Sequence, residues 1–258
     1  MPIDREATIK KAEKLLKDGK LPAAIREYVA LVEDRPDDWG SANTLGDLYV
    51  KAGEGDRAVE VFLRAADHLY KEGFYPRASA VYKKVLRIKD GHDHTIWRLA
   101  DIAAHHGLLL DARTYYARLI RDRRSRQDER GAVDCLVRLA LFEDADAEAM
   151  MVAARALLPL GEAKQAARLM LSAADDLIKH GRAAEALDIL KEAAQLSPED
   201  EDIRERVSAV ASGEGESIET PSVEAITVVE SDSLEAAPGA PVPGIAPSPV
   251  QRGAANET

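Results

Sequence analysis

The 258-residue sequence has little of what secreted and membrane proteins need. It holds a single cysteine, Cys135, which excludes an internal disulfide and a cage of cysteine thiolates around a metal ion. No apolar run approaches the roughly 18 residues that a membrane-spanning helix requires. The segment from Met1 to Lys20 is too rich in charge to contain the apolar core of a signal peptide. We therefore expect a cytoplasmic protein that has no contact with a membrane.

The motifs that carry catalysis are also missing. The sequence contains no glycine-rich phosphate loop, no nucleophile elbow and no pair of carboxylates in a recognisable frame. His92 and His94 are spaced as on a strand, and no acidic residue one helical turn away completes a zinc-binding pair. The sequence thus predicts a protein that is not an enzyme, with no catalytic residue, no metal site and no cofactor.

Charge is unevenly distributed along the chain. From Gly213 onward there are eight acidic residues and one arginine, which contribute −7 of the net charge of −11 and leave about −4 for the rest. This end also holds six of the twelve prolines. We expect a folded body over residues 1–211 and a disordered, acidic, Pro- and Ala-rich tail over residues 212–258. The body has no basic excess, so its composition does not favour nucleic acid as a partner.

Small and large residues recur together along the body. At seven places an alanine precedes an aromatic or large apolar residue by four positions, and the alanines are spaced alternately by 34 and 20 residues. The whole pattern therefore repeats every 54 residues. A small residue lets two helices approach, and a large residue one turn later fills the space beside it. The pairs are Ala24/Tyr28, Ala58/Phe62, Ala78/Tyr82, Ala112/Tyr116, Ala132/Leu136, Ala166/Met170 and Ala186/Leu190.

Further columns obey the 54-residue step. One contains Gly53, Gly107 and Gly161; a second contains Gly19, Gly73 and Gly181, with Gln127 as its exception; a third contains Leu15, Leu69 and Leu177, with Arg123 as its exception. Glycine can adopt the left-handed conformation that ends a helix and lets the chain reverse. The glycine columns therefore predict turns between helices.

The body is expected to be all-α, with about twelve antiparallel helices and no strand. They are predicted near residues 5–18, 21–34, 39–52, 56–72, 75–89, 94–106, 109–126, 129–142, 146–160, 163–180, 183–196 and 199–211. Two start signals support these boundaries. Asp38 precedes one helix, and Ser197 is expected to cap the last one with Pro198 in its first helical position.

The segment from Ala42 to Ala65 resembles the tetratricopeptide repeat family. The residues that carry the resemblance are Leu45, Gly46, Tyr49, Gly53, Ala58, Phe62 and Ala65. Looser matches extend it over nearly all of residues 5–211. The resemblance implies a right-handed α-solenoid. The 20-residue steps depart from the uniform 34-residue step of the family, and they indicate a super-repeat of three helices in 54 residues, because one helix closes one pair and opens the next.

The resemblance also implies a function. Such arrays usually bind a polypeptide segment in a concave groove lined by the first helix of each repeat, so this chain is expected to be a protein-interaction scaffold or adaptor. The groove positions carried over to this sequence are Asn43, Asp47, Trp97, Asp101, Met151 and Arg155. Trp97 lies one position beyond the core position of Ile96, so we expect it to point off the core and offer an aromatic anchor. The alternative is that Trp97 packs against the neighbouring helix.

A run of six arginines is the one feature typical of nucleic-acid binding. It consists of Arg118, Arg121, Arg123, Arg124, Arg126 and Arg130. Acidic residues interrupt the run, and cations near the end of a helix are favoured by its macrodipole, so we interpret the run as a solvated helix end. The alternative function is an RNA- or phosphate-associated helical repeat that uses this cluster. A third interpretation is a contact with the chain's own acidic tail.

Overall fold

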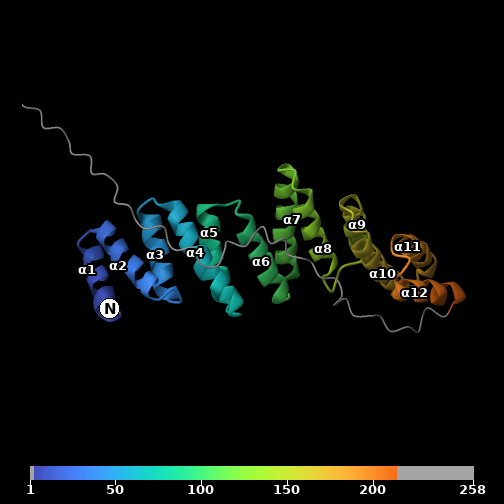
Figure 1. The fold of residues 1–258 in the computed structure, drawn as a ribbon, viewed down its shortest axis with the longest axis horizontal. Helices are drawn as coiled ribbons and strands as arrows, with labels where there is room; N and C mark the ends of the chain where they lie inside the picture. The colour runs from blue at the N-terminus through green and yellow to red at the C-terminus, as the bar shows by residue number, and fades with distance from the viewer. Residues whose placement is uncertain (1–2, 214–258) are drawn as a thin grey trace, which may run out of the picture. The chain divides into compact units, whose positions relative to one another are not determined.

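The computed structural model describes residues 3–213, and within this range the chain is all-α, as the sequence predicts (Figure 1). Most of the helix boundaries lie within two residues of those expected. The elements are α1 (Arg5–Lys17), α2 (Leu21–Asp34), α3 (Trp39–Lys51), α4 (Gly55–Lys71), α5 (Tyr75–Ile88), α6 (Asp93–His105), α7 (Leu109–Ser125), α8 (Glu129–Ala140), α9 (Ala147–Leu157) with a 3₁₀ turn (Leu158–Leu160), α10 (Ala163–Lys179), α11 (Ala183–Leu196) and α12 (Glu201–Ser212). Residues 214–258 of the expected acidic tail lie outside the described residues, and so does the interpretation that the tail contacts the arginine cluster.

Successive helices pack side by side in chain order (Figure 1). Helices α4, α7 and α10 are each 17 residues long, and each packs more extensively on both of its neighbours than α5 packs on α6 or α8 on α9. We call α3–α5 the first unit, α6–α8 the second unit and α9–α11 the third unit. Within each unit we speak of the first, middle and third helix.

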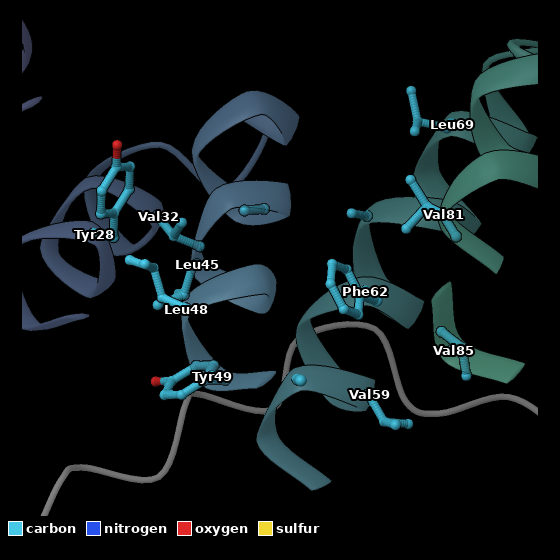
Figure 2. Close-up of a cluster of buried hydrophobic side chains, with 14 of the residues drawn as sticks. Tyr28, Val32, Leu45, Leu48, Tyr49, Val59, Phe62, Leu69, Val81 and Val85 are labelled. Atoms are coloured by element: carbon cyan, nitrogen blue, oxygen red, sulfur yellow. The ribbon is translucent and has the colours of Figure 1, made fainter. Parts of the chain in front are cut away.

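The recurring alanines lie where helices meet. Ala58, Ala112 and Ala166 are completely buried, with 0% exposure. Figure 2 shows Phe62 on α4 between labelled side chains of α3 and α5, in one apolar cluster. A Cβ atom placed on Gly46 of α3 would come within 2.4 Å of the Phe62 ring. The spacing of the helices therefore depends on small residues that face large ones, as the sequence pattern predicts.

The glycines end helices in the left-handed conformation. Gly53, Gly107 and Gly161 have φ angles of 76°, 70° and 79°. Gln127, the exception in the second glycine column, adopts the same conformation with φ of 63°. A residue with a side chain is strained there. The turn of the repeat thus imposes the left-handed conformation on Gln127, although a residue with a side chain disfavours it.

One of the two start signals is confirmed and the other is wrong. The Asp38 carboxylate accepts a hydrogen bond from the Ser41 amide at 3.2 Å, so Asp38 caps α3 as predicted. Ser197 does not cap α12. Its amide donates to the Ala193 carbonyl at 3.0 Å and ends α11, and α12 begins four residues later, at Glu201. Ser197 is therefore the C-cap residue of α11 and not the N-cap residue of α12.

Three clusters of buried apolar side chains stabilise the described part of the chain. One is formed mainly by α1–α5 and another mainly by α8–α12. The third is smaller and lies in the second unit, where it contains Ile96, Trp97, Ala100, Tyr116, Leu119 and Cys135. The second unit therefore has the smallest of the three apolar clusters.

Candidate protein-binding surface

Two of the expected groove residues lie on α3 and are held by a lysine of α5. Lys84 Nζ lies 2.8 Å from Asn43 Oδ1 and 2.8 Å from both carboxylate oxygens of Asp47. The same nitrogen lies 5.0 Å from the centre of the Phe62 ring. Lys84 thus joins the first and third helices across the middle helix. Lys84 was not among the predicted groove residues, although a basic residue recurs at this place, with Arg138 one 54-residue step later.

Asp101 of α6 is engaged by the preceding unit. The Tyr70 hydroxyl of α4 donates a short hydrogen bond to Asp101 Oδ2, and the Arg98 guanidinium lies 4.6 Å from the centre of the Tyr70 ring. Burial, followed by the hydrogen bond to Asp101, raises the pKa of Tyr70 above its ordinary value. Asp101 is therefore a fixed carboxylate, whose position is set by α4.

A polar group that the sequence analysis missed joins three consecutive helices. Asp67 of α4 accepts a hydrogen bond from the Tyr82 hydroxyl of α5 and lies 2.7 Å from His94 Nε2 of α6. Burial opposes ionisation of Asp67, but the hydrogen bonds and charge of its neighbours, His94 above all, keep its pKa below the ordinary value. No local spacing could have revealed Asp67, because its partners lie 15 and 27 residues away.

Trp97 does not point off the core. Its side chain is buried, with 7% exposure, and its ring packs edge-to-face on Tyr116 with ring centres 5.3 Å apart. The guanidinium carbons of Arg123 and Arg138 lie 5.3 and 5.7 Å from the centre of the Trp97 ring. The expectation of an exposed aromatic anchor is wrong, and the alternative holds. Trp97 lies one 54-residue step after Asn43 and Arg138 one step after Lys84, so the contact between Trp97 and Arg138 takes the place of the hydrogen bond between Asn43 and Lys84 in the first unit.

The third unit carries the remaining two groove residues, and they differ sharply. Met151 is buried, with 8% exposure, in the apolar cluster of the third unit, so it offers no groove contact. Arg155, one turn later on α9, is exposed and forms no ion pair with another residue of the described range. Of the six positions, Arg155 therefore presents the side chain that is most accessible to a partner.

The arginine cluster is not an open basic patch. The nearest ion pairs are Arg118 with Asp90 (2.9 Å), Arg121 with Asp122 (3.8 Å), Arg123 with Asp93 (3.1 Å), Arg124 with Glu129 (3.8 Å), Arg126 with Asp93 (2.7 Å) and Arg130 with Glu162 (2.8 Å). Each arginine thus has a carboxylate close by, several of them from other helices. This arrangement gives no support to the RNA- or phosphate-binding alternative.

Arg123 departs most from the expected solvated helix end. It is buried, with 5% exposure, and its Nη1 donates to the Gly131 carbonyl at 2.7 Å. A Cβ on residue 131 would come within 2.8 Å of Arg123 Nη1, so the glycine makes room for the guanidinium. Because Asp93 neutralises the charge, arginine can occupy a core position that Leu69 and Leu177 hold in the other units.

The described residues offer little to reactive chemistry. Burial raises the pKa of the Cys135 thiol to about 12, so at neutral pH the sulfur stays protonated and is a poor nucleophile. Within residues 3–213, no three His, Cys, Asp or Glu side chains gather so that they could hold a metal ion. In the same range, none of the helices is long and apolar enough to span a membrane.

Comparison with known proteins agrees with the repeat described above. The family model described as "Tetratricopeptide repeat" matches residues 9–67 and 63–129. Over residues 9–129 these matches confirm the resemblance that the sequence analysis expected. Repeats of this family generally mediate protein–protein interactions. No curated protein matches the chain in sequence.

Solved structures similar to this chain at low sequence identity include the following. A TPR repeats protein from Bacteroides fragilis is 16% identical, with 81% of this chain and 99% of that chain covered and a TM-score of 0.35. A tetratricopeptide repeat protein from Parabacteroides merdae is 14% identical, with 80% and 98% covered and a TM-score of 0.24. The TPR2AB domain of yeast Sti1, in a complex with pHSP90, is 14% identical, with 82% and 97% covered and a TM-score of 0.30.

Proposed function

We propose that this chain is a non-enzymatic scaffold or adaptor that binds a polypeptide segment against the first helices of its units. The observation that carries the proposal is the fixed polar surface on these helices. Lys84 holds Asn43 and Asp47 of α3 in place, and Tyr70 holds Asp101 of α6. A surface that is already ordered loses little conformational entropy when it binds, so more of the contact energy appears as affinity.

The proposal includes a cytoplasmic location and needs no cofactor. A single buried thiol suits a reducing compartment. The membership of residues 9–129 in a family of interaction repeats supports a polypeptide as the partner. The partner itself is a segment that reaches several first helices, since the candidate positions are spread over α3, α6 and α9.

Proximity labelling in cells tests the scaffold function. The full chain is compared with Asp47→Lys and Arg155→Glu, which reverse charge at two first-helix positions, and with Arg26→Glu, which reverses an exposed charge on α2. We expect a reproducible set of labelled proteins that Arg26→Glu preserves and the two first-helix variants lose. Labelling no different from that of an untethered labelling enzyme would overturn the scaffold function. Equal recovery by all variants would remove the first helices from the binding surface.

A further inference from the structure

Two neighbouring turns carry exposed apolar side chains. Within residues 3–213, five large apolar side chains are exposed, and three of them lie in or just after the turns between α4 and α5 and between α6 and α7. They are Phe74, Leu108 and Leu110, with 49%, 55% and 78% exposure. Because adjacent helices run antiparallel, these two turns lie at the same end of their helices.

Aromatic contacts join the two turns. The Tyr75 ring at the start of α5 packs edge-to-face on the ring of His105 at the end of α6, with ring centres 4.5 Å apart. The centre of the His106 ring lies 5.8 Å from that of Tyr75. Phe74 directly precedes Tyr75, and Leu108 follows His106 by two residues, so the two turns form one continuous edge. We call this surface the turn edge, and it consists of Phe74, Tyr75, His105, His106, Leu108 and Leu110.

The repeat does not require apolar residues at the three exposed positions. One or two 54-residue steps away, every equivalent residue within the described helices and turns is charged. These residues are Glu54 and Glu162 for Leu108, Asp56 and Lys164 for Leu110, and Lys20, Asp128 and Arg182 for Phe74. Packing within the chain therefore does not explain the apolar side chains of the turn edge. An exposed apolar patch of this kind indicates a surface that binds another protein.

The turn between α4 and α5 has an excess of positive charge. Lys71 and Arg77 are exposed, and neither forms an ion pair with another residue of the described range. The Arg77 guanidinium carbon lies 5.5 Å from the centre of the Phe74 ring. Glu72 is the acid of this turn, and it lies 4.0 Å from His68 Nε2. Two bases and one acid leave a positive charge at this end of the turn edge.

The turn between α6 and α7 has the opposite charge. Asp111 directly follows Leu110, is exposed and forms no ion pair within residues 3–213. Arg113 lies 2.7 Å from Asp144, so its charge is balanced. The exposed Glu143, beside Asp144, adds to the negative charge. The turn edge is therefore positive at the end near α5 and negative at the end near α7.

We infer that the turn edge is the interface of a homodimer, in which two copies of this chain pack together about a two-fold axis. In such an interface the same patch serves both subunits, so each end of the patch meets the other end in its copy. Apolar side chains of the two copies cover each other, and Arg77 of each copy lies opposite Asp111 of the other. A patch of one charge would repel its copy, whereas the turn edge is complementary to itself. The inference goes beyond the proposed scaffold function, since none of the groove positions belongs to the turn edge.

Analytical ultracentrifugation of the full chain at about 1–200 µM tests this inference, because a dimer of micromolar affinity dissociates within that range. We expect a concentration-dependent dimer that the variant Leu108→Glu/Leu110→Asp abolishes. This variant gives α7 the residues that α4 has at the same positions, so the fold should be retained. The control variant Val50→Glu/Val152→Glu adds the same charge at exposed apolar positions of α3 and α9 and should leave the dimer intact.

An exchange of charge between the two ends distinguishes a two-fold dimer from non-specific association. Arg77→Glu and Asp111→Arg each create two like-charged pairs in the interface, so each variant alone should raise the dissociation constant by about tenfold. Mixed together, the two variants should form a heterodimer with both pairs restored, detected by native mass spectrometry. Both changes in one chain should restore the homodimer. The fold accepts these residues, because α11 and α4 have Glu185 and Arg57 at the equivalent positions.

The inference is overturned if the wild type stays monomeric at every concentration, whether the turn edge is covered by another protein or by residues 214–258. It is also overturned if the dimer survives Leu108→Glu/Leu110→Asp, if the control variant loses the dimer as completely, or if the two charge variants form no heterodimer when mixed. None of these results changes the labelling expected of the first-helix variants, so dimerisation and partner binding are tested separately.

Discussion

The second unit differs from the units on either side of it in the chemistry of one layer. Where the first and third units have Leu69 and Leu177, the second has the buried Arg123, balanced by Asp93. The backbone nevertheless follows the same step, with middle helices of equal length. A charged residue can thus replace a core leucine in a repeat, provided that residues distant in sequence supply the counter-charge and the space.

Removal of the counter-charge of Arg123 is expected to have the largest effect on the stability of the second unit. Asp93→Ala leaves the Arg123 guanidinium buried without its carboxylate, and we expect a loss of about 3 kcal/mol in the free energy of unfolding, measured by urea denaturation. Asp90→Ala is the control, because the Asp90 side chain is 85% exposed and its pair with Arg118 contributes little. Equal losses for the two variants would show that Asp93 does not support Arg123.

An apolar layer in the second unit should tolerate the loss of the Asp93 carboxylate. In the double variant Arg123→Leu/Asp93→Ala, the core position matches Leu69 and Leu177 and no charge is left buried. We expect most of the stability lost in Asp93→Ala to return, since an apolar replacement of a buried ion pair is often neutral. Urea denaturation of the single and double variants measures this, and a double variant no more stable than Asp93→Ala would contradict it.

The close approach of α3 and α4 at Gly46 is a feature in which the first unit differs from the second. Gly46→Ala would press a methyl group against the buried Phe62 ring, whereas the second unit has Ala100 at this position. We expect a loss of about 1–3 kcal/mol from overpacking, seen as a lower thermal midpoint. Gly40→Ala on the same helix is the control, since its nearest atom would be 3.4 Å away and alanine favours a helix. Equal midpoints for the two variants would contradict the close packing.

Strain at a turn is a smaller difference between the units. Gln127→Gly would give the second unit the glycine that the first and third have as Gly73 and Gly181. We expect a gain of about 0.5–1 kcal/mol in the free energy of unfolding, because relief of left-handed strain exceeds the extra entropy of glycine in the unfolded chain. Urea denaturation measures the gain, and a loss of stability would indicate that the Gln127 side chain is stabilising.

The smallest expected difference concerns two equivalent carboxylates, Asp67 and Asp175. Hydrogen bonds keep the pKa of Asp67 low, whereas burial raises the pKa of Asp175 despite Arg206. The contribution of Asp67 to stability is therefore present at neutral pH and lost as pH falls through its folded pKa. That of Asp175 is greatest in acid and lost as pH rises through its folded pKa. Carbon-13 NMR of the carboxyl groups should show Asp67 titrating at lower pH than Asp175, and the reverse order would contradict this.

The fold was predictable because its determinants are local and repeated. The alanine and glycine columns gave the helices and turns, since a small residue at a crossing and a left-handed turn residue leave a clear mark in the sequence. The arrangement of the candidate surface was not predictable in the same way. Trp97 and Arg123 were assigned to two different surfaces, yet they contact each other in one core. Their burial depends on Asp93 and Gly131, whose role no local pattern reveals.

Three helices in each unit is an odd number, and adjacent helices run antiparallel. The first helices of neighbouring units therefore point in opposite directions, so α3 and α9 share a direction that α6 reverses. An extended peptide has one polarity, and it would meet its equivalent contacts in alternating orientation. On the proposed surface, equivalent contacts in the same orientation recur every two units, which is 108 residues of this chain. We expect ligands whose recognition features match this longer step to bind most specifically.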